Sequence, residues 1–480
     1  MIFCEPVFLF VFLPALLAAY YAAPERAKNP LLASASLLFY ALGEWRFLGW
    51  LIASVALNYW IAIGIDRYRN RPWAFRLLVI GVASDLALLV VFKYAGFIAI
   101  NLNRVLAWTD AAPVSVPQLL LPLGISFFTF HKISYKVDVY RGVAEARRQP
   151  LDLALYILLF PQLVAGPIVR YNEIARELVT RVVTRVDLAA GIRRFTIGLG
   201  KKMIVANTVA YPADQIFGLP TSDLTMGLAW LGVVCYSLQI YFDFSGYSDM
   251  AIGLARMFGF HFPENFNYPY IANSVTDFWR RWHMSLSRWF RDYLYIPLGG
   301  NRATPARTYV NLVVVFLLCG FWHGASWGFV VWGLFHGVLL VVERLGLASL
   351  LARMPRAIAH GYTLFAILVG WALFRGGTLH QSADIIAAMV GFGQGDGLAV
   401  NVELFLTMDL LLIGFAGMIG SMPLRGTVVR IFDRLRTRTG GRASTTVDAT
   451  FHTAWHAAVL GYSLLLIAAQ TYNPFIYFRF

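Results

Sequence analysis

The sequence predicts an all-α integral membrane protein that crosses the bilayer many times. Of its 480 residues, 59% are hydrophobic and only 14% are charged, whereas a typical soluble domain has about 25% charged residues. The hydrophobic residues fall in long runs along the whole chain, which is the pattern of membrane-spanning helices. The chain also has 14 tryptophans and 23 tyrosines, and these rings are enriched where helices meet the membrane surfaces. We therefore expect a polytopic protein with roughly 11–13 transmembrane or re-entrant helices.

The apolar runs follow one another without an internal repeat or a separate soluble domain, so residues 1–480 are expected to form a single membrane domain. Several runs are shorter than the roughly 20 residues that span the hydrocarbon core. Irregular backbone at membrane depth needs surrounding protein or a water-filled cavity, so we expect a polar interior passage. The expected spans are Val7–Ala22, Leu31–Leu42, Phe47–Ile65, Leu77–Phe92, Phe97–Trp108, Leu119–Phe130, Leu153–Val164, Leu188–Val205, Leu228–Phe242, Tyr309–Phe321, Trp327–Val342, Tyr362–Leu373, Ile385–Phe392, Leu404–Met422 and Thr453–Ala469.

The positive charge of the chain indicates its orientation. The net charge is +14, and the basic residues lie in loops between apolar runs, so the expected partner is membrane lipid and not nucleic acid. The positive-inside rule assigns such loops to the cytoplasmic side. Three loops carry the arginines: Arg67, Arg69, Arg71 and Arg76 in the first, Arg170, Arg176, Arg181 and Arg185 in the second, and Arg425, Arg430, Arg434, Arg436, Arg438 and Arg442 in the third.

The cysteines and histidines do not predict a metal site. Cys4, Cys235 and Cys319 each lie in or beside an apolar run without metal-ligand spacing, so we expect buried free thiols. His323 and His336 are too far apart to share one helical turn, and no H-E-x-x-H motif or cysteine pair occurs. No metal ligand and no bound cofactor are therefore expected.

The central segment, residues 243–342, carries the candidate site. It opens with Asp243 and Asp249 at the end of an apolar run, where a carboxylate is unfavourable unless it faces a cavity or a partner. One interpretation is that the two carboxylates cap a helix or pair with nearby arginines. The other is that they are polar groups supporting a buried site.

A basic aromatic helix follows, and it begins with a capping-box-like sequence at Ser274–Asp277. We expect one continuous helix from Phe278 to Tyr295, lying at the membrane interface with an aromatic face and a basic face. Its arginines either contact lipid phosphates or receive the phosphates of a donor such as coenzyme A, or an acidic carrier protein, because a guanidinium matches phosphate geometry. The aromatic face holds Trp279, Trp282, Leu286, Trp289 and Tyr293, and the basic face holds Arg280, His283, Ser287 and Arg291, flanked by Arg281 and Arg288.

His323 is the candidate catalytic residue. It follows Trp322 between two apolar runs, and an ionisable side chain at membrane depth indicates function. A lone histidine can also be a structural residue, but Gly320, Gly324 and Gly328 would allow backbone or substrate to approach closely. A low-dielectric site favours the neutral imidazole, which is the form of a general base. His283, Asp243 and Asp249 could orient this base or stabilise an oxyanion.

These residues resemble the membrane-bound O-acyltransferase (MBOAT) family over nearly the whole chain. The long central run is the most specific part of the resemblance, and the short pieces are weak when taken alone. The matching stretches are Leu123–Phe130, Tyr140–Gly142, Ala165–Arg170, Tyr241–Asp249, Phe278–Asn301, Trp322–Gly324 and Pro474–Phe478.

The resemblance implies a ring of tilted and re-entrant helices around a tunnel that joins the two membrane faces. It implies that His323 is catalytic, that His283 is a second polar position, and that Trp322 belongs to the histidine motif. The donor would be a cytoplasmic acyl thioester, either acetyl-CoA or an acylated carrier protein. In one branch of the family, acetyl passes across the cell inner membrane to periplasmic acetyltransferase partners that O-acetylate an exported polysaccharide such as alginate.

Three alternatives remain open from the sequence. The same core could transfer D-alanyl or another acyl group onto teichoic acid, peptidoglycan or cellulose. A transporter that moves an acyl donor or polysaccharide without chemistry would also place polar residues at membrane depth. Donor identity, free acetyl-CoA or an acylated carrier protein, distinguishes the kinds of acyl transfer from one another. His323→Ala distinguishes them from the transporter, which would keep its activity. A structural scaffold of a secretion complex would need no buried base at all.

Overall fold

The computed structural model describes residues 2–109, 111–302, 304–424, 444–469, 471–474 and 476. Within these ranges every regular element is helical, so the predicted all-α class is confirmed. Seven helical segments in the described part are long and apolar enough to cross a membrane, which confirms a multi-pass membrane protein. They are Glu25–Arg67, Pro72–Leu106, Met226–Met257, Pro305–His323, Trp327–Arg353, Arg356–Arg375 and Thr450–Ala468.

The first half of the chain contains helices from η1 to η5, where η marks short 3-10 or π helices. These are η1 (Phe8–Phe12), α1 (Leu13–Ala22), α2 (Glu25–Glu44), η2 (Trp45–Phe47), α3 (Leu48–Arg67), α4 (Pro72–Leu89), η3 (Val90–Tyr94), α5 (Ala95–Leu106), α6 (Ile125–Tyr140), α7 (Pro150–Leu158), α8 (Phe160–Leu163), α9 (Tyr171–Ile174), α10 (Arg185–Gly200), η4 (Lys201–Ala206), α11 (Asn207–Phe217) and η5 (Thr221–Asp223).

The second half begins with the longest helix. Its elements are α12 (Met226–Met257), η6 (Pro269–Ile271), α13 (Val275–Arg281), α14 (Met284–Phe290), η7 (Arg291–Tyr295), η8 (Gly300–Arg302), α15 (Pro305–His323), α16 (Trp327–Val342), η9 (Glu343–Leu347), α17 (Ala348–Arg353), α18 (Arg356–Arg375), α19 (Leu379–Met389), η10 (Val402–Leu404), α20 (Met408–Gly420) and α22 (Ser444–Ala468).

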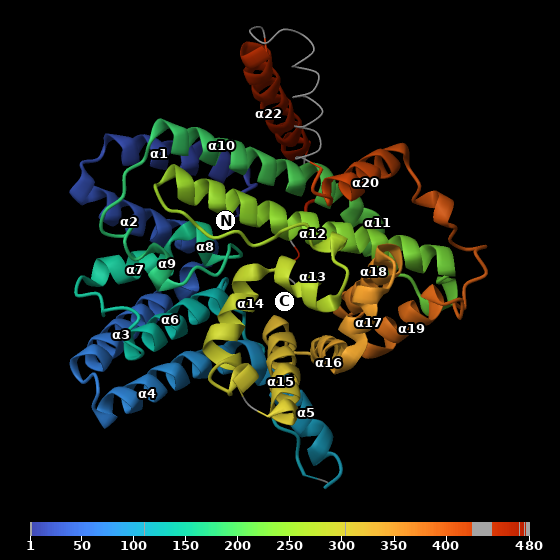
Figure 1. Cartoon of the computed structure of the whole chain (residues 1–480), viewed down its shortest axis with the longest axis horizontal. Helices are drawn as coiled ribbons and strands as arrows, with labels where there is room; N and C mark the ends of the chain where they lie inside the picture. Colours follow the sequence, from blue (N-terminus) through green and yellow to red (C-terminus); the bar gives the residue numbers. More distant parts are fainter. Residues whose placement is uncertain are drawn as a thin grey trace.

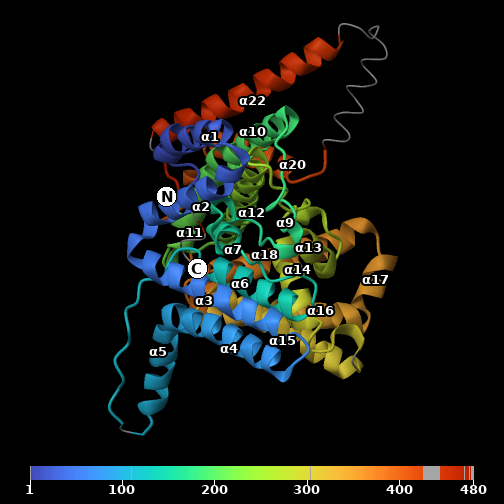
Figure 2. The same ribbon diagram turned by 90° about the vertical axis from the view of Figure 1, so that its left-hand side faces the viewer.

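Helix α12 crosses the middle of the molecule, with α10 beside it (Figure 1). The N-terminal helices α1–α4 lie on one side together with α6 and α7, and α15–α19 lie on the other. Figure 2, turned by 90°, shows that α22 extends away from this body over α1 and α10. The short helices α13 and α14 lie between the two groups, so the central segment is at the junction of both halves.

Glycines bring α10 and α12 into backbone contact. A β-carbon on Gly198 would lie 2.5 Å from the carbonyl oxygen of Gly246, and one on Gly253 would lie 2.7 Å from that of Gly191. Neither helix can carry a side chain at these positions without moving apart. Small residues are the usual basis of close helix packing in membranes, and here they hold the longest helix of the protein in place.

Several predicted spans need correction. Leu153–Val164 is interrupted at Leu159, between α7 and α8, and within Leu404–Met422 the α-helix covers only α20. Leu119–Phe130 is not one helix, because residues 111–122 are irregular and α6 begins only at Ile125, after Gly124 in left-handed backbone (φ 73°). The run predicted to end at Phe242 instead continues as α12 to Met257. The helix accommodates Asp243 and Asp249 because both carboxylates are ion-paired within the protein. The predicted pairing with an arginine is confirmed for Asp249, whereas Asp243 pairs with a lysine.

A buried charge cluster joins α3, α4 and α6, and the sequence analysis missed it. Asp85 pairs with Lys132 at 2.9 Å and with Lys136, and all three side chains are at most 1% exposed. Asn58 donates to Asp85 at 2.9 Å and Ser54 accepts from Lys132 at 2.7 Å. The ammonium groups of both lysines therefore have hydrogen-bond acceptors within the cluster. Such pairing allows charged groups to remain inside an apolar bundle.

The three cysteines are buried and free, as predicted.

Candidate active site

His323 is the last residue of α15, where the helix meets an extended turn. Gly324 has extended backbone, and α16 begins at Trp327. A β-carbon on Gly320 would lie 2.2 Å from the carbonyl oxygen of Phe329, and one on Gly324 would lie 2.1 Å from the Phe329 ring. The predicted close approach is therefore confirmed at Gly320 and Gly324. At Gly328 no atom of the described residues comes that close, since the nearest neighbour of an added β-carbon would be 3.7 Å away.

Lys93 caps the helix end that carries His323. Its ammonium donates to the carbonyl oxygens of Trp322 at 2.5 Å and of His323 at 3.1 Å. The last carbonyls of a helix lack intrahelical partners and carry partial negative charge, so a lysine here satisfies both requirements. Lys93 could not be predicted from the sequence, because its partners lie 229 and 230 residues away.

The continuous helix predicted from Phe278 to Tyr295 is wrong, because the chain breaks at His283. Helix α13 ends at Arg281, and α14 starts at Met284. His283 itself has left-handed backbone (φ 44°, ψ 53°), which non-glycine residues rarely adopt and which often marks a functional site. The break turns the imidazole inward, where it is 1% exposed; a continuous helix would have left it on the basic outer face.

Asn265 holds the His283 ring in one tautomer. Its Oδ1 lies 3.2 Å from His283 Nδ1 and also accepts from the Ser285 N–H at 3.1 Å and the Ser285 hydroxyl at 2.8 Å. Its amide nitrogen donates to Ser248 Oγ at 3.1 Å. Because the carbonyl oxygen only accepts, Nδ1 carries the proton and Nε2 keeps its lone pair. Nε2 has no hydrogen-bond partner within the described ranges.

The two histidines line one small cavity, which we call the histidine chamber. Its volume is about 20 Å³, and its other walls are apolar or aromatic: Ile240, Phe244, Trp282, Trp332, Trp371, Phe374 and Ile476. No carboxylate lines it, so nothing offsets the desolvation of a charged imidazole, and the neutral form of both rings is favoured. Among the residues with described placement, no three His, Cys, Asp or Glu side chains converge as a metal ion would require.

Two larger cavities flank the end of α15. The first, the arginine cavity, has a volume of about 450 Å³ and is lined by Trp279, Cys319 and other apolar residues, with Arg280, Arg291 and Arg344 among its polar ones. The second, the distal cavity, measures about 150 Å³ and is lined by Glu44, Lys93, residues 121–127, Val164, Trp322 and His323. Cys319 and His323 are one helical turn apart, so α15 separates the two cavities.

The two cavities lie toward opposite ends of the bundle. Glu44 precedes α3, whereas the first arginine-rich loop follows it, and a helix of this length measures about 30 Å. The first and second arginine loops meet at one cavity of about 810 Å³, which Arg69, Arg147 and Arg176 help to line. Arg291 belongs to the same end, because the neighbouring Asp292 accepts from Arg141, just after α6, and from Arg170. The third predicted loop, from Arg425 to Arg442, lies outside the described residues.

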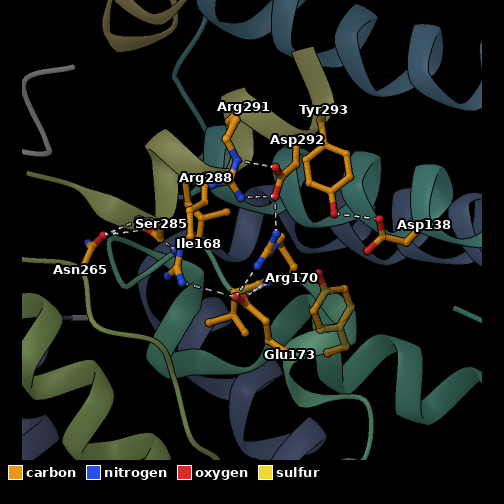
Figure 3. Close-up of polar contacts among 12 residues, drawn as sticks. Asp138, Ile168, Arg170, Glu173, Asn265, Ser285, Arg288, Arg291, Asp292 and Tyr293 are labelled. Atoms are coloured by element: carbon orange, nitrogen blue, oxygen red, sulfur yellow. Dashed lines mark hydrogen bonds and ion pairs between the residues drawn. The ribbon is translucent and has the colours of Figure 1, made fainter. Parts of the chain in front are cut away.

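The four arginines of the predicted helix Phe278–Tyr295 have different surroundings. Arg280 and Arg291 line the arginine cavity. Arg281 pairs with Asp277 at 2.9 Å. The guanidinium of Arg288 lies 3.9 Å from Glu173, on the network shown in Figure 3, where Arg170 bridges Glu173 and Asp292. Arg280 and Arg291 therefore line this cavity as exposed residues, and Arg291 also pairs with Asp292 at 2.7 Å. Arg281 and Arg288 do not line it.

The carboxylates do not reach the histidines directly. Asp243 pairs with Lys202 at 2.7 Å, and Asp249 pairs with Arg194 at 2.7 Å and with Lys201 at 2.8 Å. Trp322 lines the distal cavity and stacks on Phe130 with ring centroids 5.1 Å apart.

Comparison with known proteins identifies the family. Residues 123–368 match the model of the "MBOAT, membrane-bound O-acyltransferase family". The chain is 42% identical to "Probable alginate O-acetylase AlgI" of Pseudomonas putida and 40% identical to that of Azotobacter vinelandii, over all of both chains in each case. It is 38% identical to the peptidoglycan O-acetyltransferase of Helicobacter pylori, over 82% of this chain and 80% of the relative.

The chain is a member of the MBOAT family.

This MBOAT protein is therefore a membrane O-acyltransferase whose substrate is an acyl donor. The matched range includes both histidines, α15 and both short helices of the broken segment. The residues that sequence reasoning missed, Asn265, Lys93 and Ile476, all act through contacts that are distant in sequence. Asn265 was within reach of prediction, since it stands in the irregular Phe262–Tyr270 stretch close before His283.

Proposed function

We propose that this protein transfers an acyl group, most simply acetyl, from a cytoplasmic thioester donor to a hydroxyl acceptor on the other side of the membrane. The observation that carries the proposal is the histidine chamber: two buried imidazoles lacking a carboxylate neighbour lie where α15 separates two cavities. Residues 1–480 act in this proposal as one membrane domain, placed in the cell inner membrane.

His323 is the proposed general base. Its neutral imidazole takes the proton of the acceptor hydroxyl as that oxygen attacks the thioester carbonyl carbon. The new C–O bond forms, the C–S bond breaks, and the imidazolium returns its proton to the leaving thiolate. This transfer needs no oxidant, reductant or metal. His283 faces the same chamber with its Nε2 unprotonated, so its proposed role is to accept a hydrogen bond from the acceptor hydroxyl or its relay water.

The donor reaches the site from the arginine side. Arg280 and Arg291 line a cavity of about 450 Å³ at the end of the protein where the basic loops gather, which the positive-inside rule assigns to the cytoplasm. Guanidinium groups there suit the phosphates of acetyl-CoA or of an acylated carrier protein. Arg281 and Arg288 do not line this cavity, and their proposed role is to support the shape of this side instead.

The acceptor side follows from the relatives. Their names include alginate O-acetylase and peptidoglycan O-acetyltransferase, so we propose an exported polysaccharide as the final acceptor, with alginate as the first polymer to test. Periplasmic acetyltransferase partners would receive the acetyl group at the distal cavity. Peptidoglycan O-acetylation is the second candidate, favoured by the match over 82% of this chain.

The test compares thioester turnover by three proteins in lipid nanodiscs. Labelled acetyl-CoA or an acetylated carrier protein is supplied to wild type, His323→Ala and His131→Ala, with a periplasmic extract as acceptor. His131 is a matched control, since it is fully buried on α6 but lines neither the arginine cavity, nor the distal cavity, nor the histidine chamber. General-base catalysis contributes about 10²–10⁴-fold, so His323→Ala should lose that factor while His131→Ala keeps most of its turnover. Equal turnover in all three folded proteins would exclude His323 as the base.

A further inference from the structure

The chain end beyond α22 returns to the protein interior. Residues 471–474 and 476 are held by hydrogen bonds to three helical elements. Two bonds join the segment to α11: Tyr472 donates to Asp214, and Asn207 donates to Asn473 at 3.2 Å. Lys202 of η4 donates to the carbonyl oxygen of Pro474, and the N–H of Ile476 donates to Asp243 of α12 at 3.0 Å. Ile476 is 4% exposed.

The Asp243–Lys202 pair fixes the backbone of this segment. Both side chains are 1% exposed and lie 2.7 Å apart, so each charge is removed from water and needs further hydrogen bonds. The segment supplies them: its Pro474 carbonyl accepts from the lysine and its Ile476 N–H donates to the carboxylate. A buried pair that binds one backbone from both sides leaves little freedom in where Ile476 lies.

Ile476 lines the histidine chamber. The chamber measures about 20 Å³ and its wall includes His283, His323 and Phe244 as well as Ile476. A space of roughly 10–15 Å³ on this scale holds one water molecule, so the chamber accepts a group of about methyl size. Four of the other wall residues, Phe244, Trp332, Trp371 and Phe374, are aromatic rings on α12, α16 and α18, and such packed side chains yield little.

We propose that Ile476 is a specificity-determining residue that limits the transferred acyl group to acetyl, with Asp243 and Lys202 as the positioning residues that hold it there. The inference rests on the proposed function, because it assigns the chamber to the acyl chain during transfer. The acetyl methyl fits the space bounded by Ile476, whereas the extra carbons of a butyryl chain would occupy the position of its side chain. A hydrophobic pocket discriminates against one added methylene by about 10–200-fold.

The experiment measures the ratio of butyryl-CoA to acetyl-CoA turnover in full-length protein in nanodiscs. The variants are Ile476→Ala, which shortens the wall, and Ile385→Ala as a matched control, because Ile385 is also 4% exposed but lies in α19 away from the chamber. One methylene is worth about 10-fold or more in such discrimination. The butyryl-to-acetyl ratio should therefore rise at least about 10-fold in Ile476→Ala and stay unchanged in Ile385→Ala.

Each outcome decides the question. An unchanged ratio in a folded Ile476→Ala protein that still turns over acetyl-CoA overturns the inference and leaves the proposed function intact. A parallel rise in Ile385→Ala would mean that general loosening relaxes selectivity, which also overturns it. If Ile476→Ala does not fold, Ile476→Val makes the smaller change, with a smaller rise expected and no rise refuting the assignment. Absence of acetyl turnover in the wild type would instead count against the proposed function.

Discussion

Gly320→Ala tests whether helix packing sets the position of His323. The added β-carbon would lie 2.2 Å from the carbonyl oxygen of Phe329 and 3.0 Å from the Cα of Gly333. Carbon–oxygen contacts are comfortable at about 3.3 Å, so α15 and α16 must separate by about 1 Å. Overpacking of this kind costs about 1–3 kcal/mol of stability. His323 lies one turn further along α15, and a displacement of about 1 Å can reduce turnover about 10²-fold.

Gly328→Ala is the matched control. It makes the same change in the same motif, but its β-carbon would meet nothing closer than 3.7 Å, and alanine favours a helix over glycine by about 0.5–1 kcal/mol. Thermal unfolding in nanodiscs and thioester turnover are measured on both variants. A Gly320→Ala protein with the unfolding temperature and turnover of Gly328→Ala would refute the reasoning, because backbone contact would then not constrain the end of α15.

Gly324→Ala extends this test because its clash is of another kind. The obstacle there is the Phe329 ring, at 2.1 Å, and a side chain can be shortened. Phe329→Ala should therefore restore stability to Gly324→Ala while leaving Gly320→Ala, which meets the Phe329 backbone, unrepaired. Double-mutant cycles measure both couplings. Equal rescue of the two glycine variants would contradict the geometry.

Three further outcomes follow from buried polar contacts. Asp85→Ala removes the carboxylate that pairs with both lysines of the charge cluster, so the free energy of unfolding should fall by about 3–5 kcal/mol. The exposed control Glu25→Ala should lose at most about 1 kcal/mol. A similarly small loss of stability in both variants would contradict this prediction. Asn265→Ala should lower turnover at every pH, because it removes the group that orients His283. Asn265→Asp keeps a hydrogen-bond acceptor for His283, so its turnover should fall only as the pH falls, because the carboxylate favours the imidazolium form. pH–rate profiles distinguish the two variants. Lys93→Met should cost about 1–3 kcal/mol of stability through two uncapped carbonyls, measured by thermal unfolding, and an unchanged protein would show that the cap is dispensable.

The membrane architecture could be predicted because hydrophobic runs of about 20 residues leave few alternatives to helices. The same reasoning failed where a charge was paired from a distance. Asp243 and Asp249 suggested the end of a span, but α12 continues past both because lysines and an arginine of α10 and η4 neutralise them. Sequence periodicity has no access to partners of this kind.

The site was predictable in its histidines but not in their supports. Helical periodicity put His283 on an exposed basic face, and a single left-handed residue was enough to reverse that orientation. Such a conformation is sustained by tertiary contacts, here those of Asn265, which local propensity does not encode. The family resemblance, by contrast, drew attention to His323 and His283 without any knowledge of how they are held.

The narrowness of the barrier at α15 has an electrical consequence. Cys319 and His323 line different cavities only four residues apart, which is about 6 Å along a helix, compared with about 30 Å of hydrocarbon in the surrounding bilayer. With water in both cavities, most of the membrane voltage would fall across the protein between them. Moving a unit charge through that thin layer would involve nearly the full electrical work of about 2.3 kcal/mol per 100 mV. A neutral acetyl group crosses such a field without electrostatic cost, whereas a charged acyl group would not.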